Sequence, residues 1–171
     1  FQDALHQPVW IENDATAAAL AEYYLGGLIR RCTTAVVILL GHGVGAGIIH
    51  EGRLMRGESG SAGEIGMFYP GDRPRPTTLD LIATLQAAGC DVRSLADFAT
   101  AIPGYEAVIE RWLDRAADQL LMTINSALAW LEPGAIRLMS PLPAAIMNGL
   151  AERLNRRAII WGDHTAESET G

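Results

Sequence analysis

Leu40-Gly41-His42-Gly43-Val44-Gly45-Ala46-Gly47 joins two apolar runs, and this stretch decides how the middle of the chain folds. The first run covers residues 35–40, and the second begins at Ile48. The alternate glycines Gly41, Gly43, Gly45 and Gly47 let the backbone adopt positive φ and come close to a ligand or another strand. A turn with exposed N–H groups binds anions such as phosphates, whereas small residues equally suit a tight hairpin packed in a sheet. The pattern therefore predicts a hairpin and leaves both roles of the glycines open.

The composition is typical of an ordinary globular domain. The 171 residues are 49% hydrophobic and 19% charged, which fits one domain with a substantial core. A net charge of −7 and the lack of a basic stripe argue against nucleic-acid binding by this segment itself. Apolar runs of about eight residues are too short to span a bilayer, so we expect no membrane partner.

The cysteines and the start of the chain indicate its cellular setting. Cys32 and Cys90 are the only two cysteines and lie far apart in sequence. This usage fits free thiols in a reducing cytoplasm better than a disulfide. We expect no signal peptide, and because the sequence lacks an initiator Met we expect it to begin within a longer protein.

Hydrophobic periodicity predicts strands and helices along the chain. The expected helices cover residues 1–6, 15–25, 78–88, a short stretch after Ser94, 104–132 and 143–155. The expected strands cover residues 8–11, 33–40, 45–51, a third hairpin strand from Arg53, 135–139 and 158–161. The polar tail from Gly162 is expected to be frayed or to be interrupted before its natural partner. This order predicts an α/β fold in which helices cover a mixed sheet.

Two polar stretches are candidates for a functional site. Asn13 and Asp14 stand between a predicted strand and a predicted helix, where they either cap the helix or place polar groups beside its positive end. Residues 56–67 contain four glycines and no regular element, which indicates an ordered functional loop or a tight packing turn. Neither pattern alone chooses between a structural and a functional role.

Three motifs in this order resemble the ROK family, which comprises sugar kinases and sugar-responsive transcriptional repressors. They are Glu12-Asn13-Asp14-Ala15, the loop 41–47, and Gly52-Arg53-Leu54-Met55-Arg56-Gly57 followed by Ala62-Gly63-Glu64-Ile65-Gly66. The similarity is close over residues 8–67, and the later order of helices and strands agrees with it. The resemblance implies an actin-like (ribonuclease-H-like) ATPase domain. Residues 1–171 would be its C-terminal lobe, for sugar binding and dimerisation, with the N-terminal lobe and any DNA-binding domain outside the chain.

The resemblance also implies roles for individual residues. In the kinases of the family, the residue that matches Asp14 is the general base for the sugar hydroxyl, and such a base must lie within hydrogen-bond reach. The residues that match Asn13 and Glu64 bind sugar hydroxyls, and Asp80 matches a further acidic sugar contact. The glycines of the loop 41–47 face the phosphates of ATP, whose transfer normally needs Mg²⁺.

Several departures from the family pattern fall on its nucleotide side. His42 replaces the usual Thr of the phosphate loop, and Ser140-Pro141 replaces the Gly-Gly pair against which adenosine packs. The family's first phosphate loop, Asp-x-Gly-x-Thr, is absent from the chain. Met67 replaces the His that ends Gly-Glu-x-Gly-His, and residues 68–76 replace the Cys-rich zinc loop, so we expect no zinc.

These departures favour one of three hypotheses. Losing a single phosphate-contacting group costs about 2–4 kcal/mol of transition-state stabilisation. The combined losses therefore favour the sugar-binding portion of a transcriptional regulator that has no kinase activity and uses neither ATP nor Mg²⁺. The alternatives are a divergent sugar kinase with Asp14 as catalytic base and a degenerate scaffold that only dimerises. In the favoured hypothesis the protein is a cytoplasmic homodimer that binds a sugar or sugar derivative and meets DNA only through a domain outside this chain.

Overall fold

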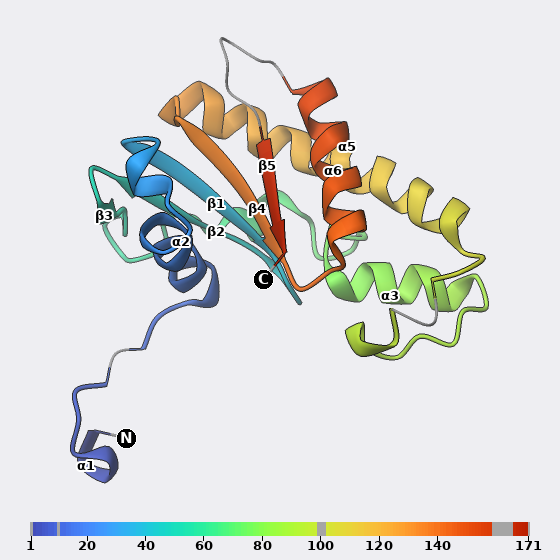
Figure 1. The fold of residues 1–171 in the computed structure, drawn as a ribbon, viewed down its shortest axis with the longest axis horizontal. Coiled ribbons are helices and arrows are strands. Elements are labelled where there is room, and N and C mark those ends of the chain that lie inside the picture. The colour runs from blue at the N-terminus through green and yellow to red at the C-terminus, as the bar shows by residue number, and fades with distance from the viewer. Residues whose placement is uncertain (1, 10, 99–101, 159–165, 171) are drawn as a thin grey trace.

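A mixed β-sheet runs through the centre of the protein (Figure 1). The computed structural model describes residues 2–9, 11–98, 102–158 and 166–170. The strands among these residues are β1 (Thr34–Leu40), β2 (Val44–His50), β3 (Arg53–Leu54), β4 (Ala135–Ser140) and β5 (Ala166–Thr170). Their order in the sheet is β3-β2-β1-β4-β5. β1 is antiparallel to β2, which follows a short turn, and parallel to β4, which follows a long helical connection.

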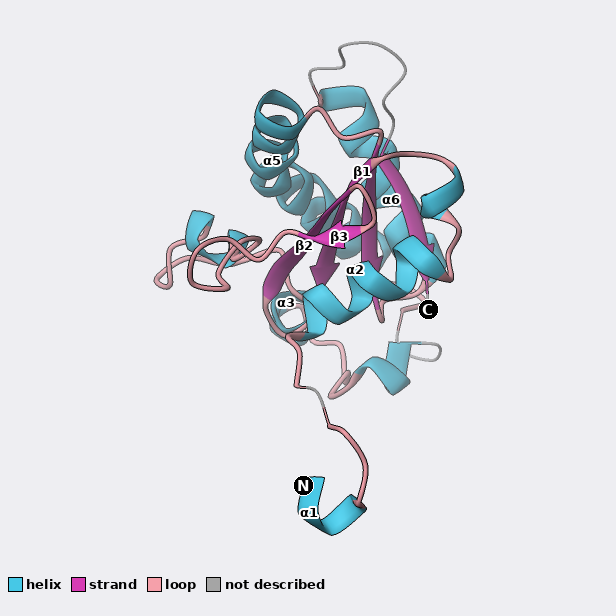
Figure 2. Cartoon of the chain, turned by 90° about the vertical axis from the view of Figure 1, so that its left-hand side faces the viewer, coloured by secondary structure: helices cyan, strands magenta, loops and turns pink. Residues whose placement is uncertain are grey.

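Helices cover both faces of this sheet (Figure 2). The α-helices are α1 (Gln2–Leu5), α2 (Asp14–Tyr24), α3 (Thr78–Ala87), α5 (Glu106–Leu131) and α6 (Ala144–Arg157), and the short 3₁₀ helices are η1 (Leu28–Arg30), η2 (Ile65–Phe68) and η3 (Leu95–Asp97). α2 packs on β1 and β2 from one side, and α6 packs on β4 from the other side with α5 against it. Among the described residues, no helix is both long and apolar enough to cross a membrane.

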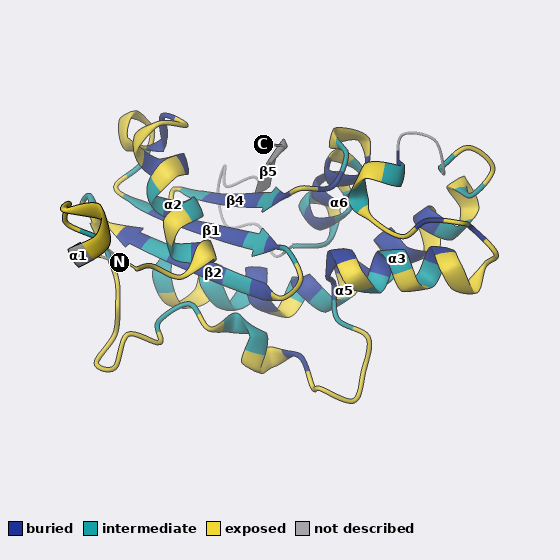
Figure 3. Cartoon of the chain, turned by 90° about the horizontal axis from the view of Figure 1, so that it is seen from below, coloured by how far each residue is buried: buried dark blue, intermediate teal, exposed yellow. Residues whose placement is uncertain are grey.

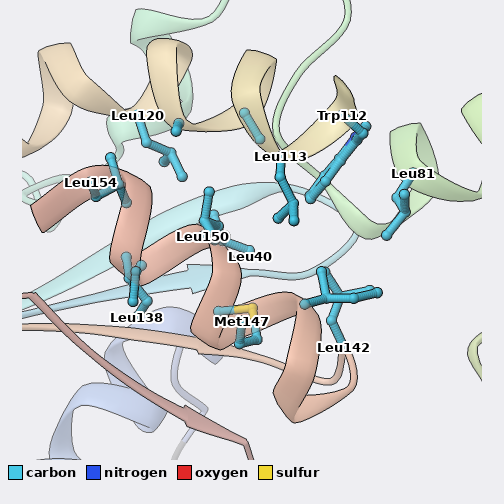
Figure 4. Packing of buried hydrophobic residues seen from close by; sticks show 14 of the residues in the cluster. Leu40, Leu81, Trp112, Leu113, Leu120, Leu138, Leu142, Met147, Leu150 and Leu154 are labelled. Atoms are coloured by element: carbon cyan, nitrogen blue, oxygen red, sulfur yellow. The ribbon is translucent and has the colours of Figure 1, made fainter. Parts of the chain in front are cut away.

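Alternation along β1 produces two separate cores. Val36, Ile38 and Leu40 belong to the core on the side of α5 and α6, whereas Ala35 and Val37 belong to the core under α2. Successive side chains of a strand face opposite ways, so one strand serves both cores. The first core is built largely from leucines of the sheet, α5 and α6 (Figure 4). Together the two cores leave the central strands mostly buried (Figure 3).

The hairpin and the main helices confirm the sequence predictions. β1 and β2 pair from Thr34↔His50 to Leu40↔Val44, which places the turn at residues 41–43. α5 ends at Leu131, and Glu132 then adopts a left-handed conformation with φ 42°. The α/β architecture with a mixed sheet and flanking helices is therefore the one that the sequence predicts.

Two predictions at the ends of the chain are wrong. Residues 8, 9 and 11 form no strand, and Ile11 is 90% exposed, because no described strand lies beside this segment to accept its backbone hydrogen bonds. The polar tail is not frayed throughout: β5 pairs in parallel with β4 from Ile136↔Ala166 to Ser140↔Thr170. Pairing at a sheet edge uses backbone groups and does not require an apolar sequence. Trp10 and residues 159–161 of the two predicted strands lie outside the described residues, and Ala158 is the C-cap that follows α6.

Tyr69 fixes the segment after η2 to α5. Its side chain is buried, and its hydroxyl shares a hydrogen bond of 2.6 Å with Oγ1 of Thr123. Burial raises the pKa of the Tyr69 phenol above its ordinary value, and the bond to Thr123 opposes that rise. The folded state therefore binds the phenol proton more tightly than the unfolded state does. This difference contributes to the free energy of unfolding: the contribution is complete below about pH 10 and is lost as pH rises through the pKa of Tyr69 in the folded state.

We therefore expect Tyr69→Phe to make the free energy of unfolding less dependent on alkaline pH. The variant should also be about 1 kcal/mol less stable at neutral pH, because Thr123 loses its partner. Urea unfolding followed from neutral pH to about pH 11 measures both effects. The control is Tyr24→Phe, at a tyrosine that is 48% exposed, which should keep the alkaline loss of the native protein. An alkaline loss that persists unchanged in Tyr69→Phe would contradict the prediction.

Candidate functional site

A small pocket lies where the N-terminus of α2 meets β2 and the loop of residues 55–64. The polar side chains in its wall are Glu12, Asn13, Thr16, Arg56 and Glu64. Its volume is about 30 Å³, whereas pockets that enclose a small molecule are typically about 300 Å³ or larger. The described residues therefore provide one wall against which part of a ligand can lie.

Asn13 caps the helix that forms one side of this pocket. Its backbone is extended (φ −65°, ψ 145°), and its Oδ1 accepts a hydrogen bond of 2.8 Å from the Ala15 amide. Oδ1 of Asp14 accepts from the same amide, also at 2.8 Å. Both side chains are exposed, and the positive end of the α2 dipole favours the Asp14 carboxylate there. The capping role is thus present, and it leaves both side chains accessible from solvent.

An ion pair between Glu12 and Arg56 crosses the pocket. The Arg56 guanidinium lies 2.6 Å from Glu12 Oε2, and the Thr16 hydroxyl donates to Glu12 Oε1 at 3.0 Å. The hydrogen bond from Arg56, followed by that from Thr16, holds the pKa of the Glu12 carboxyl below its ordinary value. The pair therefore ties the start of α2 to the loop of residues 55–64. The local sequence does not predict this pair, although Glu12 directly precedes Asn13 in the motif Glu12-Asn13-Asp14-Ala15.

Glycine 63 brings the end of this loop against the sheet. Its carbonyl accepts a hydrogen bond of 2.9 Å from the Ala46 amide of β2. Gly63 has φ 92°, and a Cβ at this position would lie 2.1 Å from the Ala46 carbonyl oxygen. Glu64 follows directly, at the start of η2, with its side chain exposed. The close approach of Gly63 to β2 is thus what places Glu64 in the pocket wall beside Asn13.

The four alternate glycines of the hairpin divide into two pairs with different roles. A Cβ on Gly45 would lie 2.8 Å from Ala15 Cβ, and one on Gly47 would lie 2.3 Å from Ala19 Cβ. Gly45 and Gly47 therefore allow α2 to pack closely on the sheet. A Cβ on Gly41 or Gly43 would meet nothing within 4 Å. None of the four has positive φ, so the turn does not use the left-handed conformation that glycine permits.

The hairpin turn is joined to α3 and to the end of β4 by hydrogen bonds. The Gly41 carbonyl accepts from both the amide (3.0 Å) and the hydroxyl (2.9 Å) of Thr78, at the start of α3. The Gly41 amide donates to the Gly43 carbonyl at 3.0 Å. The Ser140 hydroxyl donates to the Leu40 carbonyl at 2.7 Å. These polar groups near the turn are thus already engaged within the protein, while His42 at the turn is exposed.

Asp80 lies on α3 and does not line this pocket. Its Oδ2 accepts a hydrogen bond of 2.7 Å from Nε1 of Trp112 and forms an ion pair with Arg115, both on α5. The structure therefore brings Asn13 and Glu64 together in one wall, with Asp14 beside them at the helix start. Asp80 stands apart from them, and its role as a sugar contact stays a prediction.

Metal ligands do not gather in the part of the chain that the structure describes. No group of three or more His, Cys, Asp or Glu side chains is arranged there to hold an ion. In the segment that replaces the zinc loop, the Pro74 carbonyl instead accepts a hydrogen bond of 2.6 Å from Gln119 of α5. Met67, at the position of the expected His, is 79% exposed on η2.

The mixed sheet, its flanking helices and the motif order define the class of the protein as one part of an actin-like ATPase domain. The family model described as "ROK family" matches residues 1–125, and the chain belongs to the ROK family. The chain is 36% identical over 154 residues to the uncharacterized protein y4fQ of Sinorhizobium fredii, covering 90% of this chain and 39% of that protein. It is 33% identical to the bifunctional enzyme NanE/NanK of Brucella melitensis, covering 98% of this chain and 34% of the enzyme.

Solved structures of both kinds of ROK protein share this fold. A ROK family glucokinase from Streptomyces griseus, in complex with glucose and AMPPNP, matches 99% of this chain and 65% of its own with a TM-score of 0.76 and 20% identity. A ROK family transcriptional regulator, a homologue of the E. coli MLC protein, matches 98% of this chain and 49% of its own with a TM-score of 0.66 and 21% identity. The chain spans well under half the length of the two curated relatives. The likeness therefore establishes family and fold, and kinases and regulators both remain among its relatives.

Proposed function

We propose that this chain is the sugar-binding and dimerising portion of a ROK-type transcriptional regulator that acts without kinase activity. The observation that carries this proposal is the state of the polar groups around the hairpin turn. The Gly41 amide and the Thr78 donors already bond within the protein, whereas Asn13 and Glu64 face solvent in a shared pocket wall. A protein that senses a sugar requires exposed polar side chains such as Asn13 and Glu64, and it does not require a phosphate site.

The pocket wall offers the groups that hydroxyl recognition needs. Asn13 and Glu64 provide amide and carboxylate oxygens, and Arg56 adds guanidinium donors. The Thr16 hydroxyl donates to Glu12 and can accept a further hydrogen bond. Because this wall alone is too small to enclose a sugar, the proposal requires a second lobe that closes over it. In the same proposal Asp80 becomes a further sugar contact only if its carboxylate exchanges Trp112 and Arg115 for a sugar hydroxyl.

The described residues fit ATP and Mg²⁺ poorly. The open space at Gly41 and Gly43 would admit a phosphate, but the Gly41 amide is bonded to Gly43 and no acidic cluster for a metal ion lies among the described residues. Ser140, which stands where the family resemblance implies a Gly-Gly pair beside adenosine, donates its hydroxyl to the Leu40 carbonyl. The proposal therefore includes no nucleotide, no Mg²⁺ and no zinc.

A divergent sugar kinase is the second candidate, and one observation favours it. Asp14 keeps an exposed carboxylate next to Asn13 at the edge of the pocket, where a general base would have to stand. In that case Asp14 takes the proton of the attacking sugar hydroxyl.

The regulator hypothesis further proposes a cytoplasmic homodimer and DNA contacts through a domain outside this chain.

We expect Glu64→Ala to weaken sugar binding at least about tenfold without unfolding the protein, because it removes a hydrogen bond from a charged acceptor. The side chain is exposed, so its loss leaves no cavity. Isothermal calorimetry of the full-length protein with a panel of hexoses and amino sugars measures the affinity, and thermal unfolding checks the fold. The control is Glu58→Ala, which removes an exposed carboxylate of the same loop that does not line the pocket. Unchanged affinity in Glu64→Ala would argue against a sugar site here.

A kinase assay separates the two candidate functions. The full-length protein is incubated with Mg²⁺, ATP and the same panel, and product formation is followed. The regulator hypothesis predicts sugar binding without turnover. Turnover that disappears in Asp14→Asn would establish the kinase instead.

A further inference from the structure

A second, larger cavity lies between α3 and α5, away from the pocket of Asn13 and Glu64. Its volume is about 320 Å³, which is within the range of sites that bind small molecules. α3 and the N-terminal half of α5 lie side by side around it (Figure 1). We call this cavity the α3–α5 groove and define it by Ala87, Ala88, Val108, Arg111, Trp112 and Arg115.

The floor of the α3–α5 groove is apolar and rigid. Ala87 at the end of α3 and Ala88 directly after it face Val108 and Trp112 of α5 across the groove. Trp112 is only 1% exposed and its Nε1 donates to Asp80, so this side chain supports the groove from beneath. The apolar surface open to a ligand is therefore that of Ala87, Ala88 and the half-buried Val108.

The rim of the groove carries a net positive charge in an acidic protein. Arg111 is exposed, and no ion pair joins it to any other described residue. Arg115 is paired with Asp80, but its Nε is buried and has no hydrogen-bond partner among the described residues. Two arginines and one aspartate leave a single positive charge. By contrast, Arg153 and Arg157 of α6 are each paired with carboxylates of α5.

We propose that the α3–α5 groove binds a small organic anion with a short apolar body. The oxyanion, a carboxylate or a phosphate ester, pairs with the Arg111 guanidinium and with the partly exposed guanidinium of Arg115. The apolar body lies over Ala87 and Val108. Arginine suits this task because its planar group binds oxyanions through two parallel hydrogen bonds. The inference does not depend on the proposed sugar site.

Calorimetric titration of the full chain with benzoate, phenyl phosphate, phenol and inorganic phosphate tests this inference. The expected result is saturable one-to-one binding of benzoate or phenyl phosphate, with phenol and inorganic phosphate at least about tenfold weaker. The preferred aromatic acid distinguishes a carboxylate ligand from a phosphate ligand. Phenol that binds as tightly as both acids, or no saturable binding of either acid, would overturn the proposal.

Two variants locate the binding in the groove. Arg111→Gln should weaken binding of the preferred acid by about tenfold, and Ala87→Glu should abolish it by placing a carboxylate at the rim. Both positions are exposed, so the fold should persist, and thermal unfolding checks this. The control Arg53→Gln removes an exposed arginine on β3, at the opposite end of the molecule from α3 (Figure 1), and should not change the affinity. Equal losses in Arg111→Gln and Arg53→Gln would refute a site in the groove.

Discussion

Replacing Gly63 with alanine is expected to lower the free energy of unfolding by about 3 kcal/mol or more. The residue has φ 92°, and the added Cβ would lie 2.1 Å from the Ala46 carbonyl oxygen. That oxygen belongs to the backbone of β2, so it cannot move aside as the end of a flexible side chain would. Urea unfolding of Gly63→Ala and of the native protein gives the difference directly.

The control for this prediction separates backbone strain from the steric contact. Gly60 has φ 83°, and a Cβ there would meet nothing within 4 Å. Gly60→Ala should therefore cost only about 1 kcal/mol, from the unfavourable φ alone. If both variants lose the same stability, the loop does not approach β2 as described. Because Gly63 positions Glu64, Gly63→Ala should also weaken any ligand that Glu64 binds.

Neutralising Glu22 is expected to cost about 3–5 kcal/mol of stability, because it leaves a buried charge uncompensated. Glu22 of α2 and Arg137 of β4 are 4% and 5% exposed, and their charged groups lie 3.2 Å apart. Glu22→Gln keeps the shape of the side chain and removes only its charge, so the loss reports how much the buried guanidinium of Arg137 depends on the Glu22 carboxylate. Chemical unfolding at neutral pH measures it.

An exposed ion pair provides the comparison for Glu22. Asp91 and Arg93 pair at 3.3 Å with side chains that are 85% and 82% exposed. Asp91→Asn should change stability by about 0.5 kcal/mol or less, since water solvates the remaining charge. The double variant Glu22→Leu with Arg137→Met should recover much of the loss, because it leaves no buried charge. A small effect of Glu22→Gln would mean that water reaches this pair in solution.

Periodicity and turn chemistry in the sequence predict most of the architecture. The apolar run of β1 and the repeated apolar positions of α5 belong to single elements, so a window of residues contains the whole signal. The family resemblance also implied that Asn13 and Glu64 bind the same sugar, and the structure places both in one pocket wall.

Contacts between distant segments could not be predicted in the same way. Glu12 and Arg56 are 44 residues apart, and Asp80 meets Arg115 across 35 residues. Nothing local distinguishes these charged residues from ordinary surface positions. The strand β5 escaped prediction for a related reason: a polar segment joins a sheet when a neighbouring edge is free, and that edge lies elsewhere in the sequence. The opposite happens at residues 8–11, where a strand was predicted and none forms. This segment is apolar, but no described strand lies beside it.

The close packing of α2 on β2 has a consequence for how the protein opens locally. The N-terminal turns of α2 pack through Ala15 and Ala19 against Gly45 and Gly47, whereas its larger buried side chains, Glu22 and Tyr23, lie in its last turn. Small residues bury little apolar area, so the N-terminal turns of α2 should exchange their amide hydrogens with solvent sooner than the middle of α5 does. The pocket wall at residues 12–16 therefore lies at the more weakly held end of this helix. A ligand that bridges this helix and the loop of residues 55–64 would slow that exchange. Its binding would therefore be detected as stronger amide protection on the face of the sheet that α2 covers.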